Sequence, residues 1–232
     1  MAKPKLTYLD VKGFGEGIRL TLYVGKIDFI DHRVSYEGVK ELNDQGKLPY
    51  GQVPILEVDG EIFSQSVAIL RWAGRRAGLY PTETMQQLRC DSIEEALTDI
   101  KKLFPPVWYG SILGRNPITK GPMVPIPEPM RDEVLKGLNE TVLPARFAQL
   151  ERALKKSGGP YFCGEDMMSC DISFYVMGSG LLSDNYAEGV KASVLDDCPL
   201  LTALIERVDN HPRVKEWNEA HDHQPLPKKR KT

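Results

Sequence analysis

Long apolar runs are missing from this 232-residue chain, and its N-terminus has no apolar core. A membrane-spanning helix needs about 18 or more consecutive apolar residues, and a secretory signal needs a shorter run that MAKPKLTYLD lacks. We therefore expect a cytoplasmic protein without a membrane partner. The basic end PKKRKT (227–232) resembles a nuclear import signal, although solvated chain ends have the same composition.

Cysteine and histidine are scarce, with four of each. The cysteines at 90, 163, 170 and 198 form no C-x-x-C motif and no zinc-ligand spacing, and there is no H-E-x-x-H. These absences argue against structural zinc and dithiol redox chemistry. We expect no metal and interpret the cysteines as reduced, mostly buried small hydrophobic residues.

Nucleotide-binding signatures are incomplete. The turn KGFGEG (12–17) has Ile18 where a dinucleotide fingerprint needs its third glycine, and no Gly-Lys-Ser or Gly-Lys-Thr follows. A formal net charge of −2 gives no general nucleic-acid footprint. The turn is either an anion cradle before a helix or a means of reversing the chain tightly.

What is present is an ordinary globular composition, 41% hydrophobic and 27% charged, with a change of pattern near residue 80. Before it, the expected elements are a strand at 6–11, a helix within 15–26, a strand at 29–36, a helical or irregular stretch, a hairpin at 54–64 turning at Asp59-Gly60, and a helix at 65–77 closed by Gly78. This order predicts a thioredoxin-like α/β domain at 1–80.

From there the pattern is helical only, predicting an all-α domain at 84–224 and a basic tail at 225–232. The expected helices are 84–104, 131–156, 170–182, 199–210 and 212–220. Closely spaced prolines predict an exposed loop at 110–129, which is either a lid or disordered.

Two short segments could bind a ligand. Pro54 lies at the entry to a predicted strand, where a cis peptide after Val53 would turn the backbone of Val53 outward to pair with a peptide ligand. Gln65 and Ser66 begin the next helix, so an amide, a hydroxyl and unpaired N–H groups converge on one carboxylate-sized pocket. An N-cap alone is the simpler interpretation of Ser66.

Together these segments resemble the cytosolic glutathione transferases. The resemblance rests on LTYLDVKGFGEGIR, which contains Tyr8, and on LPYGQVPILEVDG, QSVAILRWA and GEDMMSCDISFYV. It covers nearly the whole chain and is most similar to the sigma class, which includes glutathione-dependent prostaglandin D synthases, with features of the mu and pi classes. It implies the glutathione transferase fold, a thioredoxin-like domain followed by an all-α domain.

The resemblance gives Tyr8 the catalytic role. A thiol with a pKa near about 8.5 is only a few per cent thiolate at neutral pH, and lowering that pKa by about two units takes about 2.7 kcal/mol of preferential anion stabilisation. A tyrosine O–H aimed at the sulfur, aided by the positive end of the next helix, can supply this. The turn at 12–17 would then shape the thiol end of a glutathione site.

The other expected site residues follow from the same resemblance. Those expected to bind glutathione with Tyr8 are Gln45, Lys47, Gln52, Val53, Pro54, Gln65, Ser66 and, from the other subunit, Asp99. Those expected to form the apolar electrophile pocket are Leu9, Phe14, Phe104, Trp108 and Tyr109, with a core role open for the last three. Phe14 stands where sigma and pi members have an arginine near the thiolate.

A homodimer is also implied. Asp91, Glu95 and Asp99 recur at i, i+4 and i+8 on one helix, a stripe that is either a solvated face or part of the subunit interface. Tyr50 matches the aromatic key that some classes insert into the partner. Acidic residues here bind a divalent metal in sigma-class prostaglandin synthases, but Thr98 replaces one of them, so no metal is expected.

The expected function is therefore conjugation of glutathione, as co-substrate, to a small apolar electrophile in detoxification. One alternative is a glutathione-dependent isomerase similar to prostaglandin D synthase. Another is a non-catalytic carrier or structural protein on the same fold.

Overall fold

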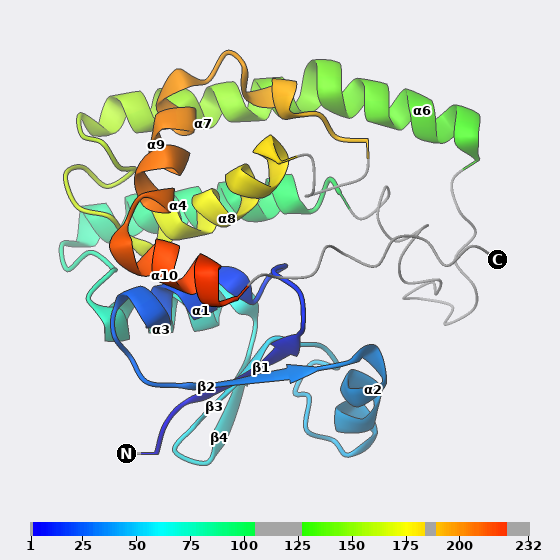
Figure 1. Cartoon of the computed structure of the whole chain (residues 1–232), viewed down its shortest axis with the longest axis vertical. Coiled ribbons are helices and arrows are strands. Elements are labelled where there is room, and N and C mark those ends of the chain that lie inside the picture. Colours follow the sequence, from blue (N-terminus) through cyan, green and yellow to red (C-terminus); the bar gives the residue numbers. More distant parts are fainter. Residues whose placement is uncertain (1, 105–126, 184–188, 222–232) are drawn as a thin grey trace.

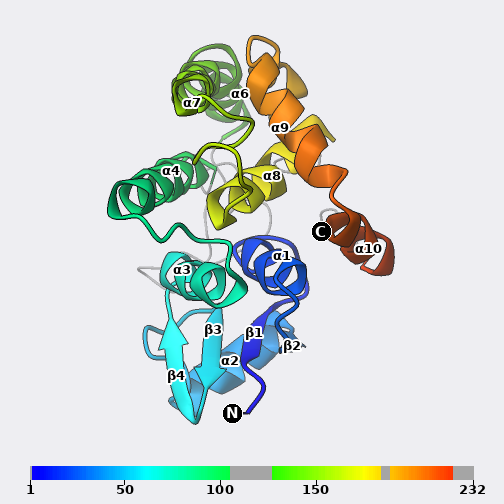
Figure 2. The same ribbon diagram turned by 90° about the vertical axis from the view of Figure 1, so that its left-hand side faces the viewer.

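The chain folds into a small sheet beneath stacked layers of helices (Figures 1 and 2). The computed structural model describes residues 2–104, 127–183 and 189–221. Trp108, Tyr109, most of the expected loop at 110–129 and the basic tail lie outside these ranges. Within them, no helix combines the length and the apolar character needed to cross a membrane.

The N-terminal part has the predicted thioredoxin-like order of elements. They are β1 (Lys5–Leu9), α1 (Glu16–Val24), β2 (Ile30–Val34), α2 (Tyr36–Asp44), β3 (Ile55–Val58), β4 (Glu61–Ser64) and α3 (Ser66–Ala77). The sheet order is β2-β1-β3-β4, with β1 parallel to β2 and the other pairs antiparallel. Helices α1 and α3 lie on one face of this sheet, and α2 lies away from them beside β2 (Figure 2).

Local turn signals are confirmed. Asp59 and Gly60 both have positive φ, 49° and 85°, as a two-residue hairpin turn requires. Gly78 closes α3 in the left-handed conformation with φ 70°. The hairpin register pairs Ile55 with Ser64, which brings the start of α3 beside the start of β3.

The remaining elements are helical. They are α4 (Thr84–Lys101), α6 (Glu128–Gly137), the π-helical segment Leu138–Val142, α7 (Leu143–Ser157), α8 (Ser169–Leu182), the 3₁₀ segment Ala192–Leu195, α9 (Pro199–Asp209) and α10 (Pro212–Ala220). The prediction of one continuous helix at 131–156 was wrong in two respects. The helical region begins earlier, at Glu128, inside the expected loop, and a π-helical turn ahead of Pro144 divides it into α6 and α7.

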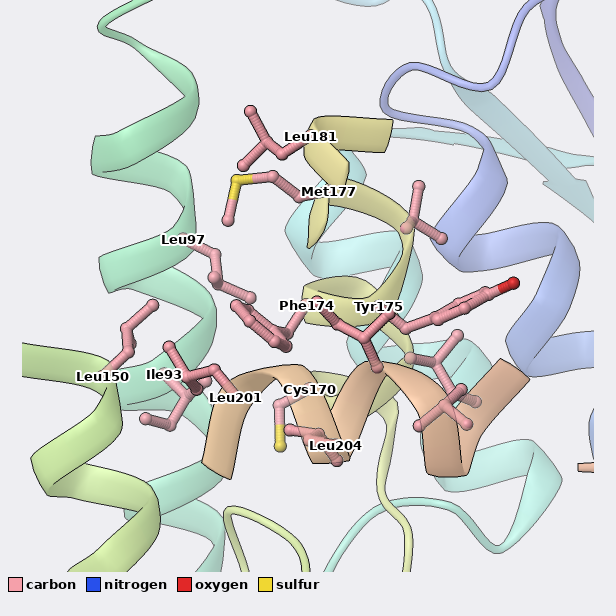
Figure 3. Packing of buried hydrophobic residues seen from close by; sticks show 14 of the residues in the cluster. Ile93, Leu97, Leu150, Cys170, Phe174, Tyr175, Met177, Leu181, Leu201 and Leu204 are labelled. Atoms are coloured by element: carbon pink, nitrogen blue, oxygen red, sulfur yellow. The ribbon is translucent and has the colours of Figure 1, made fainter. Parts of the chain in front are cut away.

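Two apolar cores hold the layers together. The smaller one fills the space between the sheet and helices α1 and α3, with Leu6, Ile18 and Leu56 each at most 1% exposed. The larger one surrounds α8, whose Phe174 and Met177 lie among side chains of α4 such as Leu97 (Figure 3). Helix α8 is buried along most of its length because neighbouring helices cover it on several sides.

Helix α10 ties the last helices back to the first. Trp217 Nε1 donates to the buried Glu16 Oε1 at 2.8 Å, and Arg213 Nε donates to the Tyr23 carbonyl at 2.9 Å. The Trp217 ring also packs on Tyr23 with a 5.0 Å centroid distance. Contacts between residues that are 190 and 201 positions apart in the sequence thus hold both ends of α1.

Candidate functional site

Tyr8 is held by the glycine-rich turn that follows it. Its ring is 5% exposed, and its Oη accepts a hydrogen bond from the Phe14 backbone N–H at 3.0 Å. A Cβ at Gly13 would lie 2.5 Å from Tyr8 Oη, and one at Gly15 would lie 2.4 Å from Tyr8 Cδ1. The glycines therefore let the backbone wrap closely around the phenol. A donor to Oη also polarises the O–H, which strengthens it as a donor to a ligand.

The side chain of a buried arginine also fixes this turn, through hydrogen bonds to its backbone. Arg19 is 0% exposed; its Nε donates to Asp31 Oδ1 at 2.9 Å and its Nη1 contacts Glu16 Oε2 at 3.3 Å. Its remaining N–H groups donate to the carbonyls of Val11 and Leu9 at 2.9 and 3.0 Å. The carboxylate of Glu16 lies in the first turn of α1. Its negative charge reduces the positive potential at this helix end, which was expected to help stabilise the thiolate.

The two predicted ligand-binding segments meet at the hairpin. The Val53–Pro54 peptide is cis, as expected. Gln65 has a positive φ of 76°, a conformation that a non-glycine residue adopts rarely, and its exposed side chain makes no capping hydrogen bond to α3. Such backbone conformations are held by surrounding structure and cluster at ligand sites. Ser66 follows as the first residue of α3 and is half-buried.

A cavity lies between α1, α3, α4 and α8, beside the turn that holds Tyr8. It contains about 360 Å³ of unfilled space, part of it open to solvent. Its lining residues are Gly13, Phe14, Gly17, Ile18, Ser66, Val67, Leu70, Glu94, Thr98, Lys101, Ser173 and Val176. Of the predicted site residues, the cavity brings together Phe14 and Ser66. Tyr8 adjoins it through the hydrogen bond with Phe14.

The sequence analysis missed the polar end of this cavity. Lys101 Nζ donates to Ser173 Oγ at 3.4 Å and lies 5.9 Å from the centre of the Phe14 ring. Burial raises the pKa of Glu94 to about 7, although Lys101 opposes the shift, and burial lowers the pKa of Lys101. A basic side chain thus lies beside Phe14, but it comes from α4. The sequence held one signal for this polar end. Glu94 lies between Ile93 and Leu97, two apolar residues that face the core.

One predicted pocket aromatic belongs to the core. Phe104 is 0% exposed and packs in the large apolar core, and it is not among the cavity residues. This burial favours the core role that was left open for Phe104, and its place in the pocket wall stays a prediction. Leu9, the last residue of β1, is half-buried and also outside the cavity lining.

The expected glutathione residues on the loops are exposed. Gln45 ends α2, Lys47 follows it, and Gln52 directly precedes Val53. None of these three lines the cavity between the layers. All three side chains are open to solvent.

The expected interface stripe is largely paired within the chain. Asp91 Oδ1 accepts from Arg71 Nε at 2.7 Å and from Tyr80 Oη at 2.9 Å. Glu95 lies 3.7 Å from the same arginine, measured from Oε1 to Nη2. Asp91 and Glu95 thus join α4 to Arg71 of α3. Such a contact within the chain was not among the expected roles, which were a solvated face and a subunit interface.

Two expected interface groups project from the surface. Asp99 is 65% exposed and pairs with the neighbouring Lys102 at 3.0 Å. Tyr50 is 68% exposed, an unusual position for a large aromatic side chain.

Comparison with known proteins agrees with this geometry. Residues 119–221 match the family model "Glutathione S-transferase, C-terminal domain". The chain is 32% identical over 222 residues to Glutathione S-transferase 1 of Ascaris suum, covering 94% of this chain and 96% of that protein. Identity to hematopoietic prostaglandin D synthase of Gallus gallus is 31% over 219 residues, with 94% and 96% covered.

A solved structure shows the same fold over the whole length. The structure of prostaglandin synthase D of Nilaparvata lugens superposes with a TM-score of 0.76 at 27% identity, covering 97% of this chain and all of that one. The similarity of fold and sequence thus extends along the full length of the chain. This protein belongs to the glutathione S-transferase family.

Proposed function

We propose that this protein is a glutathione S-transferase that joins the glutathione thiolate to small apolar electrophiles. The observation that carries the proposal is the placement of Tyr8, whose hydroxyl accepts a hydrogen bond from the backbone N–H of Phe14, a residue that lines the cavity between the helical layers. An O–H held in this way can donate to a thiolate with little loss of entropy, which favours the anion over the thiol.

The proposed glutathione site follows the hairpin. The backbone of Val53, beside the cis Pro54, would pair with the cysteinyl part of glutathione, and Gln65 and Ser66 would bind its γ-glutamyl carboxylate at the start of α3. Gln52 would contact the same ligand. Gln45 or Lys47 would reach the glycine carboxylate, and Asp99 of the second subunit the γ-glutamyl ammonium.

Replacing Tyr8 by phenylalanine tests the proposal. With glutathione and an aromatic halide, we expect the intact protein to turn over and Tyr8→Phe to lose about ten-fold or more in kcat/KM, equal to about 1.4 kcal/mol of transition-state stabilisation. Tyr161→Phe removes a hydroxyl between α7 and α8, outside the cavity lining, and should leave the rate unchanged. Equal rates for the Tyr8 variant and the intact protein would reject the role of Tyr8.

A glutathione-dependent isomerase is the second candidate. It is favoured by the full-length similarity to two prostaglandin D synthases. In that reaction the thiolate would open an endoperoxide and leave again, so glutathione would not be consumed. Turnover of an endoperoxide without loss of free thiol would distinguish this activity from conjugation. Glutathione binding without either reaction would instead indicate a carrier.

We also propose that the protein forms a homodimer through Tyr50 and the α4 surface. An aromatic side chain that is 68% exposed is a suitable anchor for a pocket on the partner. Sedimentation equilibrium should give twice the chain mass for the intact protein and a weaker dimer for Tyr50→Ala. Phe63→Ala, at another exposed aromatic residue, is the matched control. A monomeric intact protein would refute this proposal.

A further inference from the structure

Three cysteines that are far apart in sequence converge at the start of α8. Cys90 lies on α4, Cys163 in the loop before α8, and Cys170 in the first turn of α8. Their sulfur atoms all lie within 4.8 Å of one another, and Cys163 and Cys170 are 4.0 Å apart. All four cysteines of the protein are free thiols, and Cys198 stands outside this group.

The loop that carries Cys163 is built into the fold. Tyr161 and Gly164 exchange two backbone hydrogen bonds of 3.1 Å, so Cys163 sits in a tight turn. Phe162 fixes that turn to α8, since its N–H donates to Asp171 Oδ1 at 2.9 Å and its ring packs edge-on against Phe174. The approach of the sulfurs is therefore set by buried contacts on both sides of the loop.

The spacing is compatible with three sulfur ligands on one metal ion. With a metal–sulfur bond of about 2.3 Å, two sulfurs on one ion lie about 3.8 Å apart in a tetrahedral site and about 4.0 Å apart in a trigonal one. Thiolates are soft ligands that select soft metals such as Cu(I) and Zn(II). Structural zinc almost always has four protein ligands, whereas here only three donors group together within the described ranges.

The surroundings also favour thiolate. The positive end of α8, a 14-residue helix, lies at Cys170 and favours negative charge on its sulfur. Cys163 is only partly buried, which gives an entry route to the two buried sulfurs.

We propose that Cys90, Cys163 and Cys170 form a binding site for one soft, thiophilic metal ion, with Cu(I) as the best match. The ion bonds to three sulfurs, and each thiol proton leaves to solvent as its sulfur binds. No electron is transferred. The site is separate from the cavity near Tyr8, because none of the three cysteines lines that cavity.

Competition for Cu(I) tests the site. Reduced protein, free of oxygen and glutathione, is titrated against the coloured Cu(I)–bicinchoninate complex, and we expect one Cu(I) to be withdrawn per chain. Loss of an outer partner of a metal site already costs about 10–100-fold in affinity, so Cys163→Ser, which removes a ligand, should cost about 100-fold or more. Bound Cu(I) should also raise the melting temperature of the intact protein.

Matched variants decide the outcome. Cys198→Ser removes a buried thiol outside the cluster and should bind Cu(I) as the intact protein does. Cys170→Ala is a second ligand variant in case Cys163→Ser does not fold, as judged by circular dichroism. Failure of the intact protein to withdraw Cu(I) would overturn the proposal. Undiminished affinity in either folded ligand variant would do the same.

Discussion

Replacing Arg19 by methionine is expected to lower the free energy of unfolding by roughly 3–5 kcal/mol, the range for breaking a buried ion pair from one side. Methionine fills much of the same volume but leaves the carboxylate of Glu16, which is 1% exposed, without its cation. It also leaves the carbonyls of Leu9 and Val11 without the donors that Arg19 supplies. Urea unfolding of the intact protein and the variant measures the difference.

A second arginine serves as the control. Arg33 also donates to Asp31, at 2.8 Å, but its side chain is 22% exposed and its other carboxylate, Asp10, is 71% exposed. Water can replace such contacts, so Arg33→Met should cost about 1 kcal/mol or less. If Arg19→Met cost no more than Arg33→Met, the buried guanidinium would not stabilise the turn as argued.

A double variant separates charge from packing. In Arg19→Met/Glu16→Gln the buried negative charge is removed, while the amide oxygen can still accept from Trp217 Nε1. Part of the lost stability should therefore return. No recovery would place the whole cost on the other groups that lose a donor, which are the carbonyls of Leu9 and Val11 and the carboxylate of Asp31.

Features decided by a few consecutive residues could be predicted from the sequence. Asp59-Gly60 and Gly78 adopt the positive φ values that their turn types require, and the alternation of elements up to residue 80 predicted the sheet. The family resemblance supplied the identity of Tyr8. It could not explain why Gly13 and Gly15 are glycines. Only the structure shows that a Cβ at either position would collide with the side chain of Tyr8.

Features that depend on packing between distant segments were missed. In the sequence, Glu94 and Lys101 are two polar positions on an amphipathic helix. They line a cavity because other segments pack against this helix, among them α8 with Ser173. The cysteines failed every local spacing rule, yet α4 and α8 bring Cys90 and Cys170 together across 80 positions. Spacing rules detect metal ligands on one local segment, so they are silent about this kind of cluster.

Gly15→Ala is expected to lower kcat/KM by at least the ten-fold expected for Tyr8→Phe, and to cost about 1–3 kcal/mol of stability through overpacking. The backbone of Gly15 is right-handed, with φ −85° and ψ −28°, so alanine is allowed there. The added Cβ would lie 2.4 Å from Tyr8 Cδ1, and the ring must move. A displacement of about 1 Å in a catalytic group can cost about 100-fold in rate.

Gly17→Ala is the matched stability control for that prediction. Its Cβ would lie 3.8 Å from Ser173 Cα, an ordinary contact, and the residue is inside α1. Because Gly17 is the second residue of α1 and alanine is a better helix former than glycine, this variant should be as stable as the intact protein or more so. A similar loss of stability in both variants would mean that Tyr8 is not the group displaced.

The decisive comparison places Gly15→Ala in the Tyr8→Phe background. Phenylalanine keeps Cδ1, so the steric conflict and its cost in stability remain. Phenylalanine has no hydroxyl to misplace, so Gly15→Ala should reduce kcat/KM little further, and the two effects on activity should be strongly non-additive. Additive losses of activity would show that Gly15 acts on catalysis by a route other than Tyr8. The glycine-rich turn would then shape the ligand site directly, in addition to holding the tyrosine.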